Sequence, residues 1–203
     1  MDSHGQCGLC RRGLTRYDAA FAYGCYEDVL REMVHLLKYS GVRSLASPMG
    51  AWMAGALPRN QRFDLIVPMP MHWIRRWRRG FNQAELLAAE VSKRTGIPPG
   101  RPVRRARATP PQAGLSRARR RENVSGAFAM ARRADVRGKR ILLVDDVLTT
   151  GATASACAGV LKRAGATYVA VLAAARAGRS LGSAPETAAA VTTTSVMGSV
   201  KNA

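Results

Sequence analysis

Two adjacent carboxylates, Asp145 and Asp146, are the residues of this chain whose types and spacing are best suited to chemistry. The four apolar residues 141–144 predict a buried strand that ends at the carboxylates, and residues 153–164 predict a helix beyond a short turn rich in threonine and glycine. Such a turn points several backbone N–H groups into one space at the positive end of the helix. The segment therefore predicts a site for an anion such as a phosphate.

The side chains of the turn add to this predicted anion site. Gly151 lets the backbone approach a ligand closely. The hydroxyls of Thr149, Thr150 and Thr153 can donate hydrogen bonds to phosphate oxygens. Two carboxylates would repel a phosphate unless they accept hydrogen bonds from hydroxyl groups or lie near a divalent cation. A sugar phosphate offers both a phosphate and vicinal hydroxyls, with Mg²⁺ held mainly by the ligand's own oxygens, so the pattern favours that ligand class.

Three other phosphate-related motifs are excluded by the residues present. The stretch LTTGATAS lacks the lysine of a Walker A loop, and the glycine spacing of a dinucleotide fingerprint occurs nowhere in the chain. A response-regulator receiver would need a further aspartate and a lysine on later strands. Beyond Asp146 the only acidic residue is Glu186, in the tail, so that class is also excluded.

The elements that must position the carboxylates follow from apolar patterning. Short apolar runs predict strands at 19–26, 63–67, 140–144 and 168–175, with a further short strand at 126–131. Apolar residues at helical spacing predict helices at 27–39, 45–57, 83–94 and 153–164. Residues 101–121 have no periodicity and predict a long basic loop. A strand, a helix and a second strand after residue 140 predict a right-handed crossover and a parallel sheet.

The predicted organisation is an α/β fold, a parallel sheet flanked by helices, over residues 18–177. A short segment, 1–17, precedes it, and residues 178–203 have the composition of a disordered tail. Hydrophobic residues make up 47% of the chain, which excludes wholesale disorder. No run approaches the ~20 apolar residues of a membrane span, and the first residues lack the pattern of a secretory signal. We expect a cytoplasmic protein without a membrane span.

The net charge of +19 is the most unusual property of the chain. Residues 75–140 hold 19 basic and 4 acidic side chains, so this third carries most of the excess. Such a field attracts polyanions, including phosphates, pyrophosphates and nucleic acid. The alternative is that arginine has replaced lysine on solvated surfaces.

Several motifs in order along the chain resemble one family. The segment VDDVLTTGAT (Val144–Thr153) resembles the phosphoribosyl pyrophosphate (PRPP) loop of type I phosphoribosyltransferases. The segments Val67–Ala88 and Thr109–Phe128, and the pair Cys7-x-x-Cys10 followed by LKYSG (Leu37–Gly41), resemble the ComF/GntX-like family, the competence protein F group. The resemblance implies a type I phosphoribosyltransferase fold that binds PRPP with Mg²⁺.

The resemblance also implies roles for individual residues. Asp145 and Asp146 would hold the ribose hydroxyls, and Thr149–Thr153 the 5′-phosphate, within a PRPP-binding segment that comprises Asp145, Asp146, Val147, Leu148, Thr149, Thr150, Gly151, Ala152 and Thr153. Pro68, Met69, Pro70 and Met71 would form the pyrophosphate loop. Thr109–Asn123 would be the flexible loop over the site, with Gln112, Arg117, Arg120 and Asn123 as its candidate residues. Arg79 and Arg121 are the candidate catalytic residues, since positive charge would stabilise the leaving pyrophosphate.

The cysteines predict an incomplete zinc site. Cys7 and Cys10 resemble half of a zinc ribbon, and His4 would bring the ligands to three at most, whereas a structural zinc has four. Either the ribbon's first pair lies upstream of the given start, or the ribbon has been lost. Cys25 and Cys157 fall in a predicted strand and a predicted helix, and both are expected in the core.

A segment of alternating aromatic and basic residues, 72–83, leaves two alternatives open. The aromatics could stack bases of single-stranded nucleic acid while the arginines follow its backbone. We instead expect at least two of Trp73, Trp77 and Phe81 to pack into the core, with function kept for Arg79 and Gln83. His72 is the one candidate general base by position, although a histidine beside tryptophans is more often structural.

Two functions from different classes are therefore predicted. The first is Mg²⁺-dependent transfer of phosphoribose from PRPP to an unknown acceptor, with release of pyrophosphate. The alternative is a non-catalytic accessory factor that binds single-stranded DNA together with the competence machinery during DNA uptake. The sequence leaves the acceptor, turnover and oligomeric state open.

Overall fold

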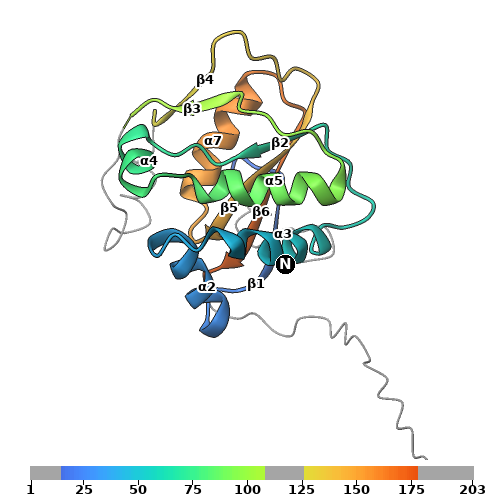
Figure 1. The fold of residues 1–203 in the computed structure, drawn as a ribbon. Coiled ribbons are helices and arrows are strands. Elements are labelled where there is room, and N and C mark those ends of the chain that lie inside the picture. Colours follow the sequence, from blue (N-terminus) through green and yellow to red (C-terminus); the bar gives the residue numbers. More distant parts are fainter. Residues whose placement is uncertain (1–14, 108–125, 178–203) are drawn as a thin grey trace, which may run out of the picture.

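A parallel four-stranded sheet in the order β1-β6-β5-β2 forms the centre of the fold (Figure 1). The computed structural model describes residues 15–107 and 126–177. The strands are β1 (Ala19–Cys25), β2 (Leu65–Pro68), β5 (Arg140–Leu148) and β6 (Tyr168–Arg176). β5 and β6 lie centrally and carry the most apolar stretches, as expected for strands covered on both faces.

Helices cover both faces of the sheet, which confirms the predicted α/β architecture (Figure 1). One face packs against α7 (Ala152–Arg163), and the other against α2 (Asp28–Tyr39), α3 (Ala46–Gly55) and α5 (Gln83–Thr95). Alternate residues of β5 serve the two layers: Ile141 and Leu143 face α7, while Leu142 and Val144 face the other three helices.

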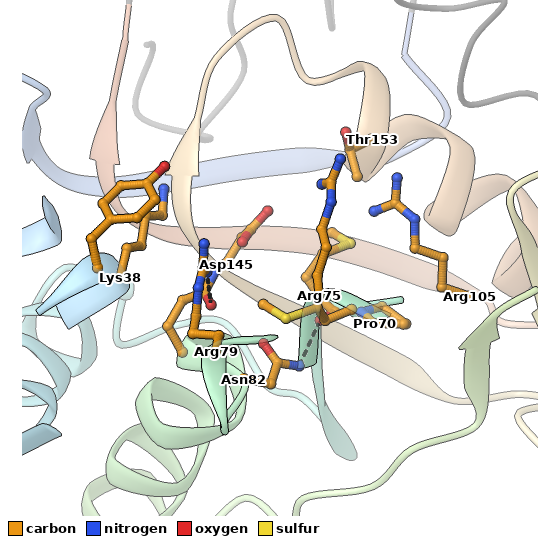
Figure 2. A pocket seen from close by; sticks show the side chains of 12 residues that line it. Lys38, Pro70, Arg75, Arg79, Asn82, Arg105, Asp145 and Thr153 are labelled. Carbon is orange, nitrogen blue, oxygen red and sulfur yellow. Dashed lines mark hydrogen bonds between the residues drawn. The ribbon is translucent and has the colours of Figure 1, made fainter. Parts of the chain in front are cut away.

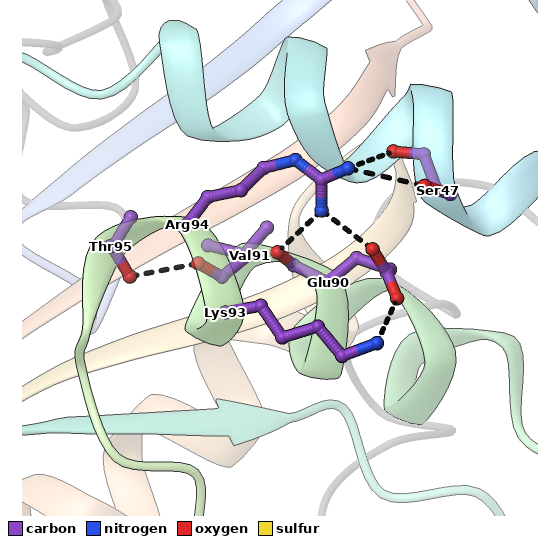
Figure 3. Close-up of polar contacts among 6 residues, drawn as sticks. All are labelled: Ser47, Glu90, Val91, Lys93, Arg94 and Thr95. Carbon is purple, nitrogen blue, oxygen red and sulfur yellow. Dashed lines mark hydrogen bonds and ion pairs between the residues drawn. The ribbon is translucent and has the colours of Figure 1, made fainter.

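Helices α3 and α5 pack closely because a glycine lies at their crossing. A Cβ atom added at Gly50 would come within 2.4 Å of the Cβ atom of Glu90. Arg94 of α5 donates to the backbone carbonyl of Ser47 at the start of α3 (3.1 Å) and to the Glu90 carboxylate (2.6 Å), which Lys93 also contacts (Figure 3). The hydrogen bonds from Lys93 and then Arg94 lower the pKa of Glu90, and the bond from Arg94 to Ser47 links the two helices at their surface.

A second, two-stranded antiparallel sheet pairs β3 (Val103–Arg105) with β4 (Phe128–Met130). Val103 and Phe128 pack in the same core cluster as α7. The prediction of a continuous loop over 101–121 is therefore wrong at 103–105, where three residues pair with a strand more than twenty positions away. The rest of that predicted loop, from residue 108, lies outside the described residues.

Most of the predicted elements are confirmed, one is corrected, and the structure adds elements that were not predicted. β5 does not end before Asp145: it continues to Leu148, because Asp145 and Val147 stay in register with Ala173 and Ala175 of β6. Residues Trp73–Arg79, for which no element was predicted, form the short helix α4, and a 3₁₀ turn at Arg43–Leu45 precedes α3. The predictions for residues 1–14 and for the tail 178–203 concern segments outside the described residues. Within the described parts of the chain, no helix is long and apolar enough to span a membrane.

Candidate functional site

A pocket of about 270 Å³ opens at the carboxyl ends of β2 and β5 (Figure 2). This is the edge at which open parallel sheets bind their ligands. Four cationic side chains and one carboxylate line it together with polar and apolar groups; the lining residues are Lys38, Tyr39, Met69, Pro70, Met71, Arg75, Arg79, Asn82, Gln83, Arg105, Asp145 and Thr153. The pocket thus combines an excess of positive charge with a single acceptor carboxylate.

The two carboxylates of β5 have different surroundings. Because β5 continues through them, strand alternation places Asp145 on the α7 side with Ile141 and Leu143, and Asp146 on the side of α2. Asp145 lines the pocket, whereas Asp146 is 4% exposed and is not among the lining residues. The Asp145 carboxylate also accepts a hydrogen bond from the backbone N–H of Asp146 (2.9 Å).

Lys38 reaches the acidic pair from the last turn of α2. Its Nζ atom lies 3.0 Å from Oδ1 of Asp146, and the two side chains are 18% and 5% exposed. The other oxygen of Asp146, Oδ2, is buried and has no hydrogen-bond partner among the described residues. Burial lowers the pKa of Lys38, but the carboxylate of Asp146 outweighs it, so the net pKa is raised and the lysine stays protonated.

The environment of Asp145 opposes its ionisation. Burial, and then the neighbouring charge of Asp146, raise the pKa of Asp145 to about 7, against the smaller opposing effect of Lys38. A carboxylate held in this way gains from a ligand that donates hydrogen bonds to it. A sugar is such a ligand, because its hydroxyl groups can donate hydrogen bonds to the carboxylate.

The turn after β5 brings backbone and hydroxyl groups to the same edge. Gly151 has a φ of +72° and lies directly before α7, and a Cβ atom there would come within 2.5 Å of the Tyr17 hydroxyl oxygen. The Thr150 hydroxyl accepts from the N–H of Ala152 (3.4 Å), and Thr153 lines the pocket. Of the nine predicted PRPP-binding residues, Asp145 and Thr153 line this pocket. Val147 and Leu148 pack instead against the two core clusters.

The predicted pyrophosphate loop is held by the start of α5. Pro68 ends β2, and Met69, Pro70 and Met71 line the pocket. Asn82 donates from Nδ2 to the carbonyl of Met69 (3.1 Å), and its Oδ1 caps α5 by accepting from the N–H of Ala84 (3.1 Å). No residue of 68–71 is charged, so this loop brings no charged side chain to an anion.

Helix α4 carries Arg79 into the pocket. The Arg79 guanidinium donates to Oε1 of Gln83 (2.6 Å) and lies 5.3 Å from the ring centre of Tyr39. His72 begins the helix, since its Nδ1 accepts from the N–H of Ile74 (3.3 Å), and its side chain is 7% exposed. His72 therefore caps α4, and its side chain is not among those that line the pocket.

The expectation that at least two of the three aromatics of this segment are in the core is wrong. Phe81 is buried, but Trp73 and Trp77 are 69% and 80% exposed. They are four residues apart on α4, so they share one side of a helix whose other residues include Arg76 and Arg78. Helix α4 has 7 residues and buries none of its side chains, so both tryptophans remain on the surface.

Two further arginines converge from different elements. Arg75 belongs to α4 and Arg105 to β3, and Figure 2 shows both guanidinium groups near Thr153. Burial, and then the charge of Arg75, lower the pKa of Arg105. Two guanidinium groups that lie close together can both donate hydrogen bonds to one phosphate, so this side of the pocket is suited to a phosphate.

Sequence reasoning missed the contributions of Lys38, Tyr39, Asn82 and Arg105 to the pocket. The LKYSG motif was the one signal for the first two of them. The remaining candidates, Arg121, Gln112, Arg117, Arg120, Asn123, Cys7 and Cys10, lie outside the described residues. Within the described ranges no group of three or more potential metal ligands occurs. Cys157 is buried as expected, but Cys25 is exposed.

Comparison with known proteins identifies the class. The family model described as phosphoribosyl transferase domain matches residues 78–194, more than half of the chain. With the parallel sheet flanked by helices, this places the protein in the type I phosphoribosyltransferase superfamily. "Competence protein F" of Haemophilus influenzae is 32% identical over 179 residues, covering 84% of this chain and 78% of its own. The chain belongs to the competence protein F (ComF) family.

A second relative agrees with this family. "DNA utilization protein YhgH" of Escherichia coli K12 is 33% identical over 176 residues, covering 83% of this chain and 77% of its own. Among solved structures, the glutamine PRPP amidotransferase of B. subtilis has a TM-score of 0.45 and 25% identity over 64% of this chain. The match spans 26% of that longer polypeptide.

Proposed function

We propose that this protein binds PRPP in the pocket at the ends of β2 and β5 and transfers its phosphoribosyl group to an acceptor. The observation that carries the proposal is the meeting of one acceptor carboxylate, Asp145, with four cationic side chains around a glycine-threonine turn. PRPP has a matching distribution of groups: hydroxyls on the ribose, a phosphate at one end and a pyrophosphate at the other.

The pocket residues would act on the bond between the anomeric carbon and the pyrophosphate. As this bond breaks, its electron pair leaves with pyrophosphate, and the acceptor supplies the pair for the new bond and loses a proton to water. Arg79 would offset negative charge growing on the leaving group, while Asp145 would hold the ribose hydroxyls. Mg²⁺, held mainly by oxygens of PRPP, would withdraw further charge from the pyrophosphate.

Titration calorimetry with PRPP, with and without Mg²⁺, tests the binding. We expect Asp145→Asn to weaken PRPP binding at least about tenfold, since a charged hydrogen-bond acceptor is lost. Asp135→Asn is the matched control, because Asp135 is an exposed aspartate outside the pocket. No binding by the wild type, or equal binding by Asp145→Asn, would contradict the proposed site. Pyrophosphate release with nucleobase or nucleic-acid acceptors then tests transfer.

Exposed tryptophans on α4 favour a second function, the binding of single-stranded DNA. Trp73 and Trp77 offer two ring faces beside arginines of the same helix, an arrangement on which bases stack while phosphates pair with the cations. The names of the relatives, competence protein F and DNA utilization protein, are consistent with a role near DNA. The two functions are compatible, because these tryptophans do not line the pocket.

Fluorescence anisotropy with labelled single-stranded DNA over a range of salt concentrations tests this second function. Replacing Trp73 and Trp77 by alanine should weaken binding by about 1–3 kcal/mol for each stacked base and leave PRPP affinity unchanged. Tyr23→Ala removes an exposed aromatic from β1 and serves as the control. Equal DNA affinity in the double variant and the wild type would exclude α4 as the DNA-binding surface.

A further inference from the structure

Lys38 is a largely buried cation that both pairs with Asp146 and lines the pocket. Its ammonium group has three N–H donors, and among the described residues Asp146 is its one ion-pair partner. The lysine lines the pocket although Asp146 does not. Lys38 thus connects a carboxylate behind the pocket with the ligand space in front of it.

The cationic groups of the pocket form two sets. Figure 2 shows Arg75 and Arg105 beside Thr153, and Lys38 and Arg79 on the other side, close to Asp145. The turn before α7 and the nearby pair of arginines suit the 5′-phosphate of PRPP. The pyrophosphate, bonded to the opposite end of the sugar, then lies toward Lys38 and Arg79.

The loop at residues 68–71 increases the need for a cation on that side. It contains only proline and methionine, so it contacts a pyrophosphate without any charged side chain. A ligand with several negative charges must be neutralised by groups from other elements. Lys38 is well placed for this, because its long side chain is already immobilised by Asp146 and loses little further freedom on binding.

We propose that the two carboxylates divide their tasks: Asp145 receives the ribose, while Asp146 positions Lys38, which binds the pyrophosphate group of PRPP. Lys38 is then a ligand-binding residue supplied by α2, and Asp146 acts through it without touching the sugar. This inference rests on the proposed function and replaces the expectation that both carboxylates hold ribose hydroxyls.

Fragments of the ligand separate the two tasks. Affinities for PRPP, ribose 5-phosphate and pyrophosphate, each with Mg²⁺, are measured for the wild type and for Lys38→Met, Asp146→Asn and Asp145→Asn. Lys38→Met and Asp146→Asn should each lose at least about tenfold in affinity for PRPP and pyrophosphate and keep ribose 5-phosphate binding. Asp145→Asn should show the opposite selectivity, losing ribose 5-phosphate and keeping pyrophosphate.

A double variant guards against loss of folding. Removing one partner of a buried ion pair destabilises a protein strongly, whereas Lys38→Met combined with Asp146→Asn leaves no unpaired charge. If Asp146 acts through Lys38, the double variant binds pyrophosphate no more weakly than Lys38→Met alone. Lys38→Arg, which keeps the charge, should recover part of the lost affinity. The control is Lys162→Met, which breaks the Lys162–Asp18 pair (2.7 Å) outside the pocket.

Each outcome decides the matter. Loss of ribose 5-phosphate binding in Asp146→Asn, additive losses in the double variant, or full pyrophosphate affinity in Lys38→Met would overturn the division of tasks. A wild type that binds pyrophosphate but not PRPP would overturn the proposed function instead, and the pyrophosphate measurements would still test the role of Lys38.

Discussion

Replacing Asp145 by asparagine should stabilise the ligand-free protein at alkaline pH while it weakens the binding of PRPP. In the folded protein the pKa of Asp145 is raised from 3.8 to about 7, chiefly by burial and by Asp146. Between these two values the folded protein binds a proton at Asp145 that the unfolded chain has released. The wild-type free energy of unfolding therefore falls as the pH rises toward 7, and this fall is absent in Asp145→Asn.

The size of the effect follows from the pKa shift. Each pH unit in this window contributes about 1.4 kcal/mol, so the two units from pH 5 to pH 7 amount to about 2.7 kcal/mol. Asp145 is only partly buried at the pocket wall, and water there reduces the shift. We expect the variant to gain about 1.5 kcal/mol relative to the wild type between pH 5 and pH 8. That gain corresponds to about 3–6 °C in melting temperature for a protein of this size.

Urea unfolding at several pH values, followed by circular dichroism, measures this difference directly. Asp135→Asn is a control of opposite sign, because hydrogen bonds from the Arg137 backbone and side chain lower the pKa of Asp135. Over the same pH range, the free energy of unfolding of Asp135→Asn should therefore never rise relative to that of the wild type. A difference between Asp145→Asn and the wild type that stays constant from pH 5 to pH 8, or that shrinks, would refute the electrostatic account of the acidic pair.

Three further substitutions test the packing that holds the site. Gly151→Ala places a Cβ atom 2.5 Å from the Tyr17 hydroxyl at a positive φ, so it should cost about 1–3 kcal/mol in thermal unfolding and weaken PRPP binding in calorimetry. Gly50→Ala brings a Cβ atom within 2.4 Å of the Cβ atom of Glu90. It should lower the free energy of unfolding by about 1–3 kcal/mol and leave the PRPP affinity unchanged. Asn82→Ala removes the cap of α5 and the hydrogen bond to the carbonyl of Met69. It should lower the free energy of unfolding by about 1–2 kcal/mol and also weaken the binding of pyrophosphate. Unchanged melting temperatures would contradict each of these assignments.

The central layers of the fold could be predicted because their patterns are local. The apolar runs of β5 and β6 and the helical spacing of α2 and α5 each lie within a single stretch of sequence. Sequence reasoning failed where distant pairing decides the structure. Aspartate disfavours strands, yet the hydrogen bonds of Asp145 and Val147 with β6 carry β5 past the acidic pair.

The site was predicted only in part for the same reason. Asp145, Thr153 and the loop 68–71 stand in recognisable motifs, and the structure brings them together in one pocket. Lys38 also stands in a motif, LKYSG, but no chemical role followed from it, because a lysine in the last turn of a helix is already explained by the helix dipole. Only the packing of α2 against the sheet shows that its side chain reaches Asp146.

The pairing of β3 with β4 has a consequence for the evolution of the chain. Arg105 and Phe128 are neighbours across this ribbon, so the pairing holds the ends of the two strands side by side. The entropic cost of a longer connection grows only logarithmically, by about 0.6 kcal/mol for each doubling of its length. A longer connection between the two paired strands would therefore cost the fold little stability. Because Arg105 belongs to the ribbon and lines the pocket, any sequence added next to it would begin beside that pocket.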